Sequence, residues 1–382
     1  MKFTLLAAAV LIAAPLEAQR VRFQIDAQTP EGLLLQMAGS ESDETRKIEL
    51  YQEFLQKYPD HEGKIYALNQ VQPLWLKTKA FDKVIAAGRD ILAAEPDNAP
   101  AAYNALQACE EQNDAACVIE WANATIDAAK KKMESSEPED ETEAETWKAE
   151  VDFAKQVIQR AEYSFYAMAL KSTDPKTIVQ LSEALERANP QSEYMARTAG
   201  RAFIAILQMK DLKKALEFAE NADAKNFANE DMLLFAADTH LTGSKDYDKA
   251  VLYATKLVST LPSKEAPEGV APAEWEKKKT NTLARGYWIA GIALGVREKW
   301  PDCEKMFRDG LPLIEKSGAA GELLPGAYFY LGLANYNLAG RGPRRNRARV
   351  AAAEKYWNLC VKMKSPFQGR AQQNLQALAA GR

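Results

Sequence analysis

The chain has 382 residues, 47% of them hydrophobic and 27% charged, with a formal net charge of −4. This is the composition of an ordinary soluble protein, and the slightly acidic balance argues against a nucleic-acid-binding protein, since such domains are usually strongly basic. No G-x-S-x-G, P-loop, H-E-x-x-H or dinucleotide-binding sequence occurs. We therefore expect no enzyme, no catalytic residue and no cofactor.

The amino terminus, MKFTLLAAAVLIAAPLEAQ, has the three parts of a secretory signal peptide. Lys2 supplies the positive charge, residues 3–16 the apolar stretch, and Ala18 the small residue before cleavage. The alternative is a buried first helix. No later segment approaches the roughly 20 apolar residues that cross a bilayer. We expect residues 1–18 to be removed and the protein to be exported, to a periplasm or to the extracellular medium.

Two distant stretches share one pattern, KAFDKVIAAGRDILAAEP at 79–96 and SKDYDKAVLYATKLVSTLP at 244–262. Each has an aromatic residue, then apolar residues at helical spacing, then a proline that would end the helix. Pro59 and Pro190 close similar stretches. The chain is thus predicted to repeat a unit of two short helices.

The first helix of a unit is clearest in ARGYWIAGIALG (284–295) and GAYFYLGLANY (326–336). A small residue such as Gly291 or Gly332 would let two helices approach closely while bulky neighbours fill the gap. The pattern resembles the tetratricopeptide repeat (TPR), whose first helix carries W-x2-L-G-x2-Y and whose second helix ends at a proline. The resemblance implies an all-α fold, a right-handed TPR superhelix (α-solenoid) of antiparallel helix pairs.

In this register a capping helix at 366–380 would cover the apolar end of the array. The first unit, ending in LYQEFLQKYPDHE, is also similar to bacterial envelope TPR proteins of the Tol–Pal and outer-membrane-assembly class. The units would lie at residues 28–61, 65–98, 99–132, 159–192, 196–226, 231–262, 284–317 and 325–362.

Three insertions would interrupt the array. Residues 134–146 are acidic and poor in apolar side chains, which predicts a flexible insertion. Residues 263–280 contain prolines and are expected to be a linker, and residues 340–349 form a basic loop inside the last unit. The N-terminal, middle and C-terminal groups of units would then span 19–133, 147–262 and 281–382.

The resemblance also implies a concave face formed by the first helices, where a partner would bind. Aromatic residues and arginines favour protein binding, and arginine can hold a carboxylate through two hydrogen bonds. Alternatively, the same aromatic side chains pack between repeats, and at matching positions Ile204 and Phe235 are expected in the core. The protein-binding groove candidates are Tyr66, Asn69, Tyr103, Asn104, Arg160, Tyr163, Arg197, Arg201, Arg285, Trp288, Phe329, Tyr330 and Tyr336.

A long helix beginning near Trp147 carries an apolar seam with alternating spacings of four and three, as in a coiled coil. The seam could bury a partner helix or a second copy of this protein, giving a homo-oligomer through 147–168. We favour packing on the neighbouring repeat, because helices in proteins are stabilised mainly by tertiary packing. The seam residues are Trp147, Val151, Ala154, Ile158, Ala161, Phe165 and Met168.

The four cysteines of an exported protein would meet an oxidising compartment. Cys109 and Cys117 lie on either side of a turn within one unit and could form a disulfide, or could remain two reduced packing residues. Cys303 and Cys360 occupy apolar helical positions and are expected to be small buried side chains. With no C-x-x-C pair and two distant histidines, no metal site is expected.

The basic loop offers a possible contact for anions, through Arg341, Arg344, Arg345, Arg347 and Arg349. These arginines could contact anionic lipid headgroups or an acidic protein, contact the acidic insertion, or have no partner at all.

Taken together, the sequence predicts an exported TPR adaptor or scaffold that holds a protein or peptide partner in its groove, with no nucleic acid and no transmembrane segment after cleavage. The alternative is a structural component of a cell-envelope assembly, joined through the long helix and the basic loop. The identity of the partner does not follow from the sequence.

Overall fold

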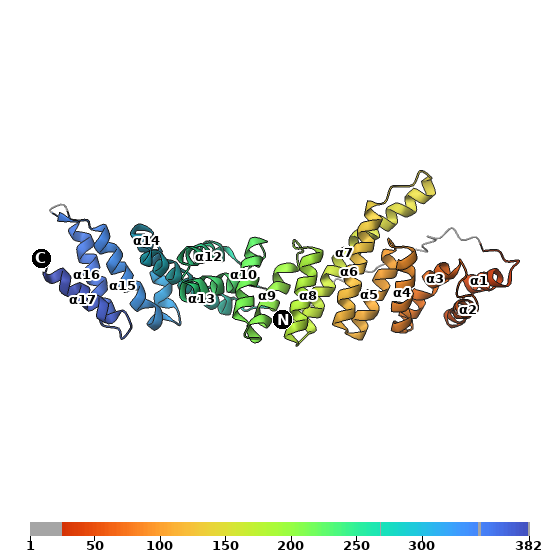
Figure 1. The fold of residues 1–382 in the computed structure, drawn as a ribbon, viewed down its shortest axis with the longest axis horizontal. Coiled ribbons are helices and arrows are strands. Elements are labelled where there is room, and N and C mark those ends of the chain that lie inside the picture. Colours follow the sequence, from red (N-terminus) through yellow and green to blue (C-terminus); the bar gives the residue numbers. More distant parts are fainter. Residues whose placement is uncertain (1–24, 268, 343–344, 381–382) are drawn as a thin grey trace. The chain divides into compact units, whose positions relative to one another are not determined.

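The structure, a computed structural model, describes residues 25–267, 269–342 and 345–380. The expected signal peptide at 1–18 and Arg344 lie outside the described residues. Within the described ranges the protein is α-helical, with short 3-10 and π turns and no strand (Figure 1). The predicted all-α class is confirmed.

The contacts divide the chain into two compact units. Unit 1 takes in the residues up to 172 together with 180–194, and unit 2 takes in 173–179 and the residues from 195 on. The helices of unit 1 are α1 (Pro30–Ser40), α2 (Glu44–Lys57), α3 (Lys64–Lys77), α4 (Phe81–Ala94), α5 (Ala99–Gln112), α6 (Ala115–Glu134), α7 (Glu141–Lys171) and most of α8 (Pro175–Ala188).

Unit 2 contains the remaining helical elements. They are α9 (Met195–Gln208), α10 (Leu212–Ala224), α11 (Glu230–Thr239) with the π turn η1 (His240–Ser244), α12 (Tyr247–Thr260) with the 3-10 turn η2 (Leu261–Ser263), α13 (Pro272–Val296), α14 (Trp300–Lys316), α15 (Ala320–Leu338), α16 (Arg347–Val361) and α17 (Gln368–Ala380).

In unit 1 each helix from α1 to α6 packs on the next helix along the chain, and in unit 2 each helix from α9 to α16 does so. The first helices of successive pairs also touch, as α3 does α5, α5 does α7, and α13 does α15. Such neighbour-only packing defines an α-solenoid, so the predicted array of antiparallel helix pairs is observed. Four second helices end two residues before the prolines at 59, 96, 190 and 262, because a proline cannot continue the backbone hydrogen bonding.

The turn inside a helix pair repeats one backbone geometry. Lys79, Asn113, Lys210, Lys245 and Glu298 each stand between the two helices of a pair with φ of 60°, 54°, 60°, 55° and 57°. This left-handed conformation costs a non-glycine residue roughly 1 kcal/mol, so its recurrence in both units reflects a turn that the packing of each pair imposes.

Glycine positions bring the paired helices together in unit 2. A Cβ built on Gly291 of α13 would lie 2.5 Å from the Phe307 ring of α14, and one on Gly332 of α15 would lie 2.3 Å from the Trp357 ring of α16. Both rings are buried. The small residue of the first-helix pattern is therefore the place where a ring from the second helix packs.

Helix α7 begins at Glu141, inside the segment expected to be a flexible insertion. The Asp140 side chain accepts hydrogen bonds from the backbone N–H groups of Thr142 and Glu143, both at 3.0 Å, and thereby caps the helix. Glu141 and Glu143 occupy the first turn, where negative charge is favourable. The acidic residues from which we predicted disorder therefore begin a helix. Only residues 135–140 of the insertion are not helical.

The expected linker is likewise partly helical, because α13 begins at Pro272. Trp275 is buried and its indole N–H donates to the Lys264 carbonyl at 3.2 Å. Glu230 of α11 pairs with Lys264 at 3.2 Å and with Lys278 at 2.9 Å. These contacts hold the segment between α12 and α13 against α11 and α13 of the same unit.

The apolar seam of α7 packs against other helices of unit 1. Ala154, Ala161 and Phe165 are fully buried, and α7 packs on α6 and α5. The Trp147 indole N–H donates to the Ser135 hydroxyl at 2.8 Å and closes the α6–α7 hairpin. The core of the seam is thus occupied by the protein's own helices, which is the packing on a neighbouring repeat that we favoured over a homo-oligomer through 147–168.

Candidate functional site

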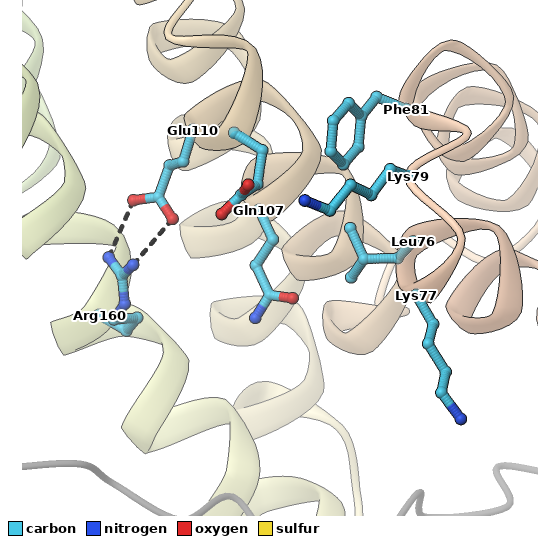
Figure 2. Close-up of a pocket in the computed structure, with 8 residues that line it drawn as sticks. Leu76, Lys77, Lys79, Phe81, Gln107, Glu110 and Arg160 are labelled. Atoms are coloured by element: carbon cyan, nitrogen blue, oxygen red, sulfur yellow. Dashed lines mark hydrogen bonds and ion pairs between the residues drawn. The ribbon is translucent and has the colours of Figure 1, made fainter.

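A cleft of about 470 Å³ opens in unit 1 between the carboxyl ends of α3 and α5 and the middle of α7 (Figure 2). The turn after α3 forms one side, the last turns of α5 form the other, and α7 contributes one residue. The cleft is lined by Leu76, Lys77, Lys79, Phe81, Gln107, Glu110, Glu111 and Arg160.

The turn after α3 directs its two lysines differently. Helix α3 ends at Lys77, and the Ala80 N–H donates back to the Trp75 carbonyl at 2.8 Å, with Lys79 between them in the left-handed conformation. Lys77 is directed away from the cleft (Figure 2) and pairs with Glu44 at 2.6 Å. Lys79 extends into the cleft beside Leu76 and Phe81 (Figure 2).

Arg160 is fixed by unit 1 itself. Its guanidinium donates to the two carboxylate oxygens of Glu110 at 3.0 and 2.8 Å, and to the Ser164 hydroxyl at 2.8 Å. The guanidinium also lies 5.3 Å from the centre of the Tyr163 ring. Burial lowers the pKa of Arg160, but the charge and hydrogen bond of Glu110, together with Tyr103 and Tyr163, outweigh burial, so that the net pKa is raised.

Three polar groups of the cleft have no partner within the described ranges. They are the Lys79 ammonium, the Glu111 carboxylate and the Gln107 amide; Lys79 and Glu111 are exposed and Gln107 is half-buried. Arg160 and Glu110 neutralise each other. A partner that enters the cleft therefore meets one unpaired cation, one unpaired anion and one amide that can both donate and accept hydrogen bonds.

Three groove candidates are buried and cannot contact a partner, which corrects the prediction. Tyr103 packs its ring on Phe153 at 6.2 Å, and Phe329 packs on Phe367 at 5.4 Å. Tyr330 is buried over Gly295, where an added Cβ would lie 2.2 Å from its ring. The aromatic positions of these helices fill the space between helices, as the alternative interpretation expected.

The two asparagine candidates belong to a polar network that joins neighbouring helices. Asn69 donates to Glu95 at 3.1 Å and accepts from Asn98 at 3.0 Å. Asn104 donates at 3.2 Å to Gln72, which in turn donates to the Val84 and Ala101 carbonyls at 3.0 Å each. Tyr66, nearby on α3, is half-buried.

In unit 2, Arg285 of α13 bridges three first helices. It pairs with Asp238 of α11 at 2.8 Å and with Glu322 of α15 at 2.7 Å. Trp288 lies under its guanidinium at 5.0 Å and donates its indole N–H to the Leu323 carbonyl at 2.9 Å. Both candidates are thus engaged by their own unit.

The remaining candidates reach the surface to different extents. Tyr163 is 41% exposed and Tyr336 38% exposed, while Arg197 is exposed and Arg201 half-buried. Ile204, expected in the core, is 53% exposed. Phe235 is half-buried and meets the Phe203 ring at 5.4 Å.

The arginines of the basic loop are divided between the surface and α15. Arg345 lies 4.5 Å from the centre of the Tyr336 ring, and Arg349 donates to the Asn335 side chain at 3.2 Å. Arg341 and Arg347 are exposed. Part of the loop charge is therefore held against its own helix.

The cysteines differ between the two units. Cys109 and Cys117 are joined by a disulfide across the α5–α6 turn, with their Cα atoms 5.4 Å apart. Cys303 and Cys360 are free and buried, and burial raises their thiol pKa values to about 12 and about 11. Burial and the raised pKa both favour the protonated thiol over the nucleophilic thiolate.

Sequence reasoning found Arg160 but missed Lys79, Gln107 and Glu111. The TPR register assigns groove positions to the middle of the first helices, where Arg160 lies, whereas the three missed residues lie near or just after the carboxyl ends of α3 and α5. The available signal was the polar composition of these ends, LKTK at 76–79 and QACEE at 107–111.

No cluster of three His, Cys, Asp or Glu side chains gathers as metal ligands in the part of the chain that the structure describes. Within the same ranges, every helix is too short or too polar to cross a membrane.

The chain matches no protein-family model and no curated protein. Among solved structures it is similar to the TPR domain of P58(IPK), with 10% sequence identity and a TM-score of 0.27, over 92% of this chain and 99% of that one. The helix-pair architecture therefore rests on the packing described above.

Proposed function

We propose that this chain is a TPR-type adaptor that binds a protein partner and carries out no reaction of its own. A solenoid of helix pairs offers extended surfaces on which a segment of another protein can lie. Since many functions share one fold, the proposal depends on a site rather than on the architecture.

The observation that carries the proposal is the cleft of unit 1. Its residues come from α3, the turn after it, the start of α4, α5 and α7, so three successive repeats cooperate in building it. The Arg160–Glu110 pair fixes the relative position of α5 and α7, while Lys79, Gln107 and Glu111 keep polar groups available for a partner. Helices held in fixed positions around unpaired polar groups suit a binding site, because the protein then loses little conformational entropy when a partner binds.

We further propose that the protein is exported and acts in a bacterial cell envelope. The support is the tripartite pattern of residues 1–18 and the resemblance of the first unit to envelope TPR proteins. The Cys109–Cys117 disulfide is consistent with an oxidising compartment.

The test is affinity capture from a cell-envelope extract of the source organism with the chain 19–382. A charge-swap variant, Lys79→Glu/Glu111→Lys, reverses both free charges of the cleft and leaves the net charge unchanged. The matched control is Glu53→Lys/Lys57→Glu on α2, which swaps an exposed pair of 2.7 Å outside the cleft.

We expect one protein to be captured by the wild type and the control and to be lost from the charge-swap variant. Far-UV circular dichroism should show equal helix content in all three proteins. Capture of the same protein by all three would move the binding site away from the cleft, and capture of nothing would contradict the adaptor proposal.

An envelope scaffold joined through the long helix and the basic loop is the second candidate. The core of the α7 seam is buried within unit 1, so this function would depend on Arg341 and Arg347, the exposed arginines of the loop. Retention of the partner by the charge-swap variant and its loss from Arg341→Glu/Arg347→Glu would support the scaffold.

A further inference from the structure

The free charges of the cleft have opposite signs and come from different elements. Lys79 belongs to the turn after α3, and Glu111 to the last turn of α5. They form no ion pair with each other or with another described residue, and Lys77 is directed away toward Glu44 (Figure 2). A ligand with one sign of charge would be attracted to one of these groups and repelled by the other, whereas a ligand with both signs would suit both.

The amide of Gln107 favours an extended ligand. The side chain lies in the cleft (Figure 2) and presents one donor and one acceptor group. An extended chain has backbone N–H and C=O groups to offer, whereas the interior of a helix has already paired them. Because Lys79 and Glu111 stand on different elements, they fix which side of the cleft takes each charge, and segments with the two charge orders would run through it in opposite directions.

The apolar part of the cleft suits the stem of a long side chain. Leu76 and Phe81 lie next to Lys79 (Figure 2), and lysine and arginine commonly lay their methylene groups on such surfaces. The volume of about 470 Å³ falls within the roughly 300–1,000 Å³ of sites that enclose small ligands. It is therefore large enough to take side chains of a bound segment.

From this geometry we infer that the cleft binds an extended segment of a partner protein with one acidic and one basic side chain two positions apart. In an extended chain such residues point to the same face. The acidic group pairs with Lys79, the basic group pairs with Glu111, and the Gln107 amide binds the backbone between them. The inference rests on the proposed function and specifies which partner segments the cleft admits.

The probes are four fluorescently labelled, blocked peptides whose central residues are Asp-Ser-Arg, Arg-Ser-Asp, Asp-Ser-Asp and Arg-Ser-Arg. Fluorescence anisotropy at low ionic strength, where exposed charges are least screened, measures their binding to the chain 19–382. One of the two mixed-charge peptides should bind about fivefold more tightly than each of the other three, since an exposed charge contact contributes a factor of about this size.

The charge-swap variant Lys79→Glu/Glu111→Lys should prefer the mixed-charge peptide of the opposite order, and the control Glu53→Lys/Lys57→Glu should keep the wild-type order. Equal binding of a single-sign peptide, an unchanged order in the charge-swap variant, or no binding of any peptide would overturn the inference.

The outcomes separate this inference from the proposed function. A partner that is captured by the wild type and lost from the charge-swap variant, without discrimination among the peptides, would leave the adaptor function standing and refute only the ligand class. Discrimination among the peptides without capture of any protein would support the ligand class and contradict the adaptor.

Discussion

Arg160 and Glu110, fifty residues apart in sequence, join α7 to α5 through two hydrogen bonds of 3.0 and 2.8 Å. Arg285 does the same in unit 2, where it ties α13 to Asp238 of α11 and Glu322 of α15. Both arginines stand at positions where the TPR resemblance implies a grip on a partner. The protein uses them instead to hold its own first helices in register.

Removing the carboxylate from the Arg160 pair should destabilise unit 1. Arg160 is 37% and Glu110 18% exposed, so we expect Glu110→Gln to cost about 1–2 kcal/mol, between the values of surface and buried pairs. Urea unfolding followed by circular dichroism measures the loss. The control is Glu120→Gln, whose partner Arg89 is largely exposed and whose loss should stay below about 0.5 kcal/mol. Equal losses would show that the Arg160 pair adds no more than a surface contact.

An added methyl group at the helix crossing of unit 2 should also be destabilising. Gly291→Ala would place a Cβ 2.5 Å from the Phe307 ring, at a cost of about 1–3 kcal/mol for overpacking. Gly321→Ala, also within a helix, meets nothing within 4 Å and should stabilise by up to about 1 kcal/mol. Thermal unfolding of both variants tests this difference in sign. A Gly291→Ala protein as stable as the wild type would mean that α13 and α14 can separate freely.

The contribution of Glu230 should depend on pH. Burial raises its pKa, but the hydrogen bond and the charges of Lys278 and Lys264 outweigh burial, so the net pKa is lowered. A carboxyl whose folded pKa is depressed stabilises the folded state above its unfolded pKa, about 4.3 for glutamate, and loses this contribution as the pH falls through the folded pKa.

We therefore expect Glu230→Gln to lower the unfolding free energy by about 1–3 kcal/mol at neutral pH. The difference from the wild type should keep its size down to about pH 5 and shrink below about pH 4. Denaturant titrations at several pH values measure it. A difference that grows toward acid would contradict the lowered pKa.

The disulfide predicts a specific thiol count. Of four cysteines, Cys109 and Cys117 are bonded and Cys303 and Cys360 are free. The purified oxidised chain, unfolded without reductant, should show two thiols, and four after reduction. Because the two bonded cysteines are eight residues apart, opening the loop should cost about 2.5 kcal/mol of stability by the chain-entropy estimate. Four thiols in the oxidised protein would show that the bond does not form.

Much of the fold could be predicted from individual residues of the sequence. A proline two residues beyond a helix end, as at Pro59 and Pro96, and a glycine beneath a ring, as at Gly291, are local requirements that the sequence must satisfy. The start of α7 was misjudged because acidic residues suit both a disordered segment and a helix N-terminus. Only the capping hydrogen bonds of Asp140 separate the two.

The site was far less predictable. The sequence shows that aromatic residues and arginines occur on the first helices, but it does not show which of their side chains are buried. Tyr330 and Phe329 are enclosed by neighbouring helices, and Arg285 by two carboxylates. Lys79, Gln107 and Glu111 carry no local signature, because each is an ordinary polar residue near a helix end.

By itself the sequence determined the all-helical class, the order of the helix pairs and the approximate ends of most units, because helix periodicity, small residues and prolines act over a few neighbouring positions. Only the tertiary structure decided which charged side chains form ion pairs within the protein and which have no such partner. That outcome depends on contacts between residues 30 to 50 positions apart, such as Arg160 with Glu110 and Lys77 with Glu44, which no local pattern encodes.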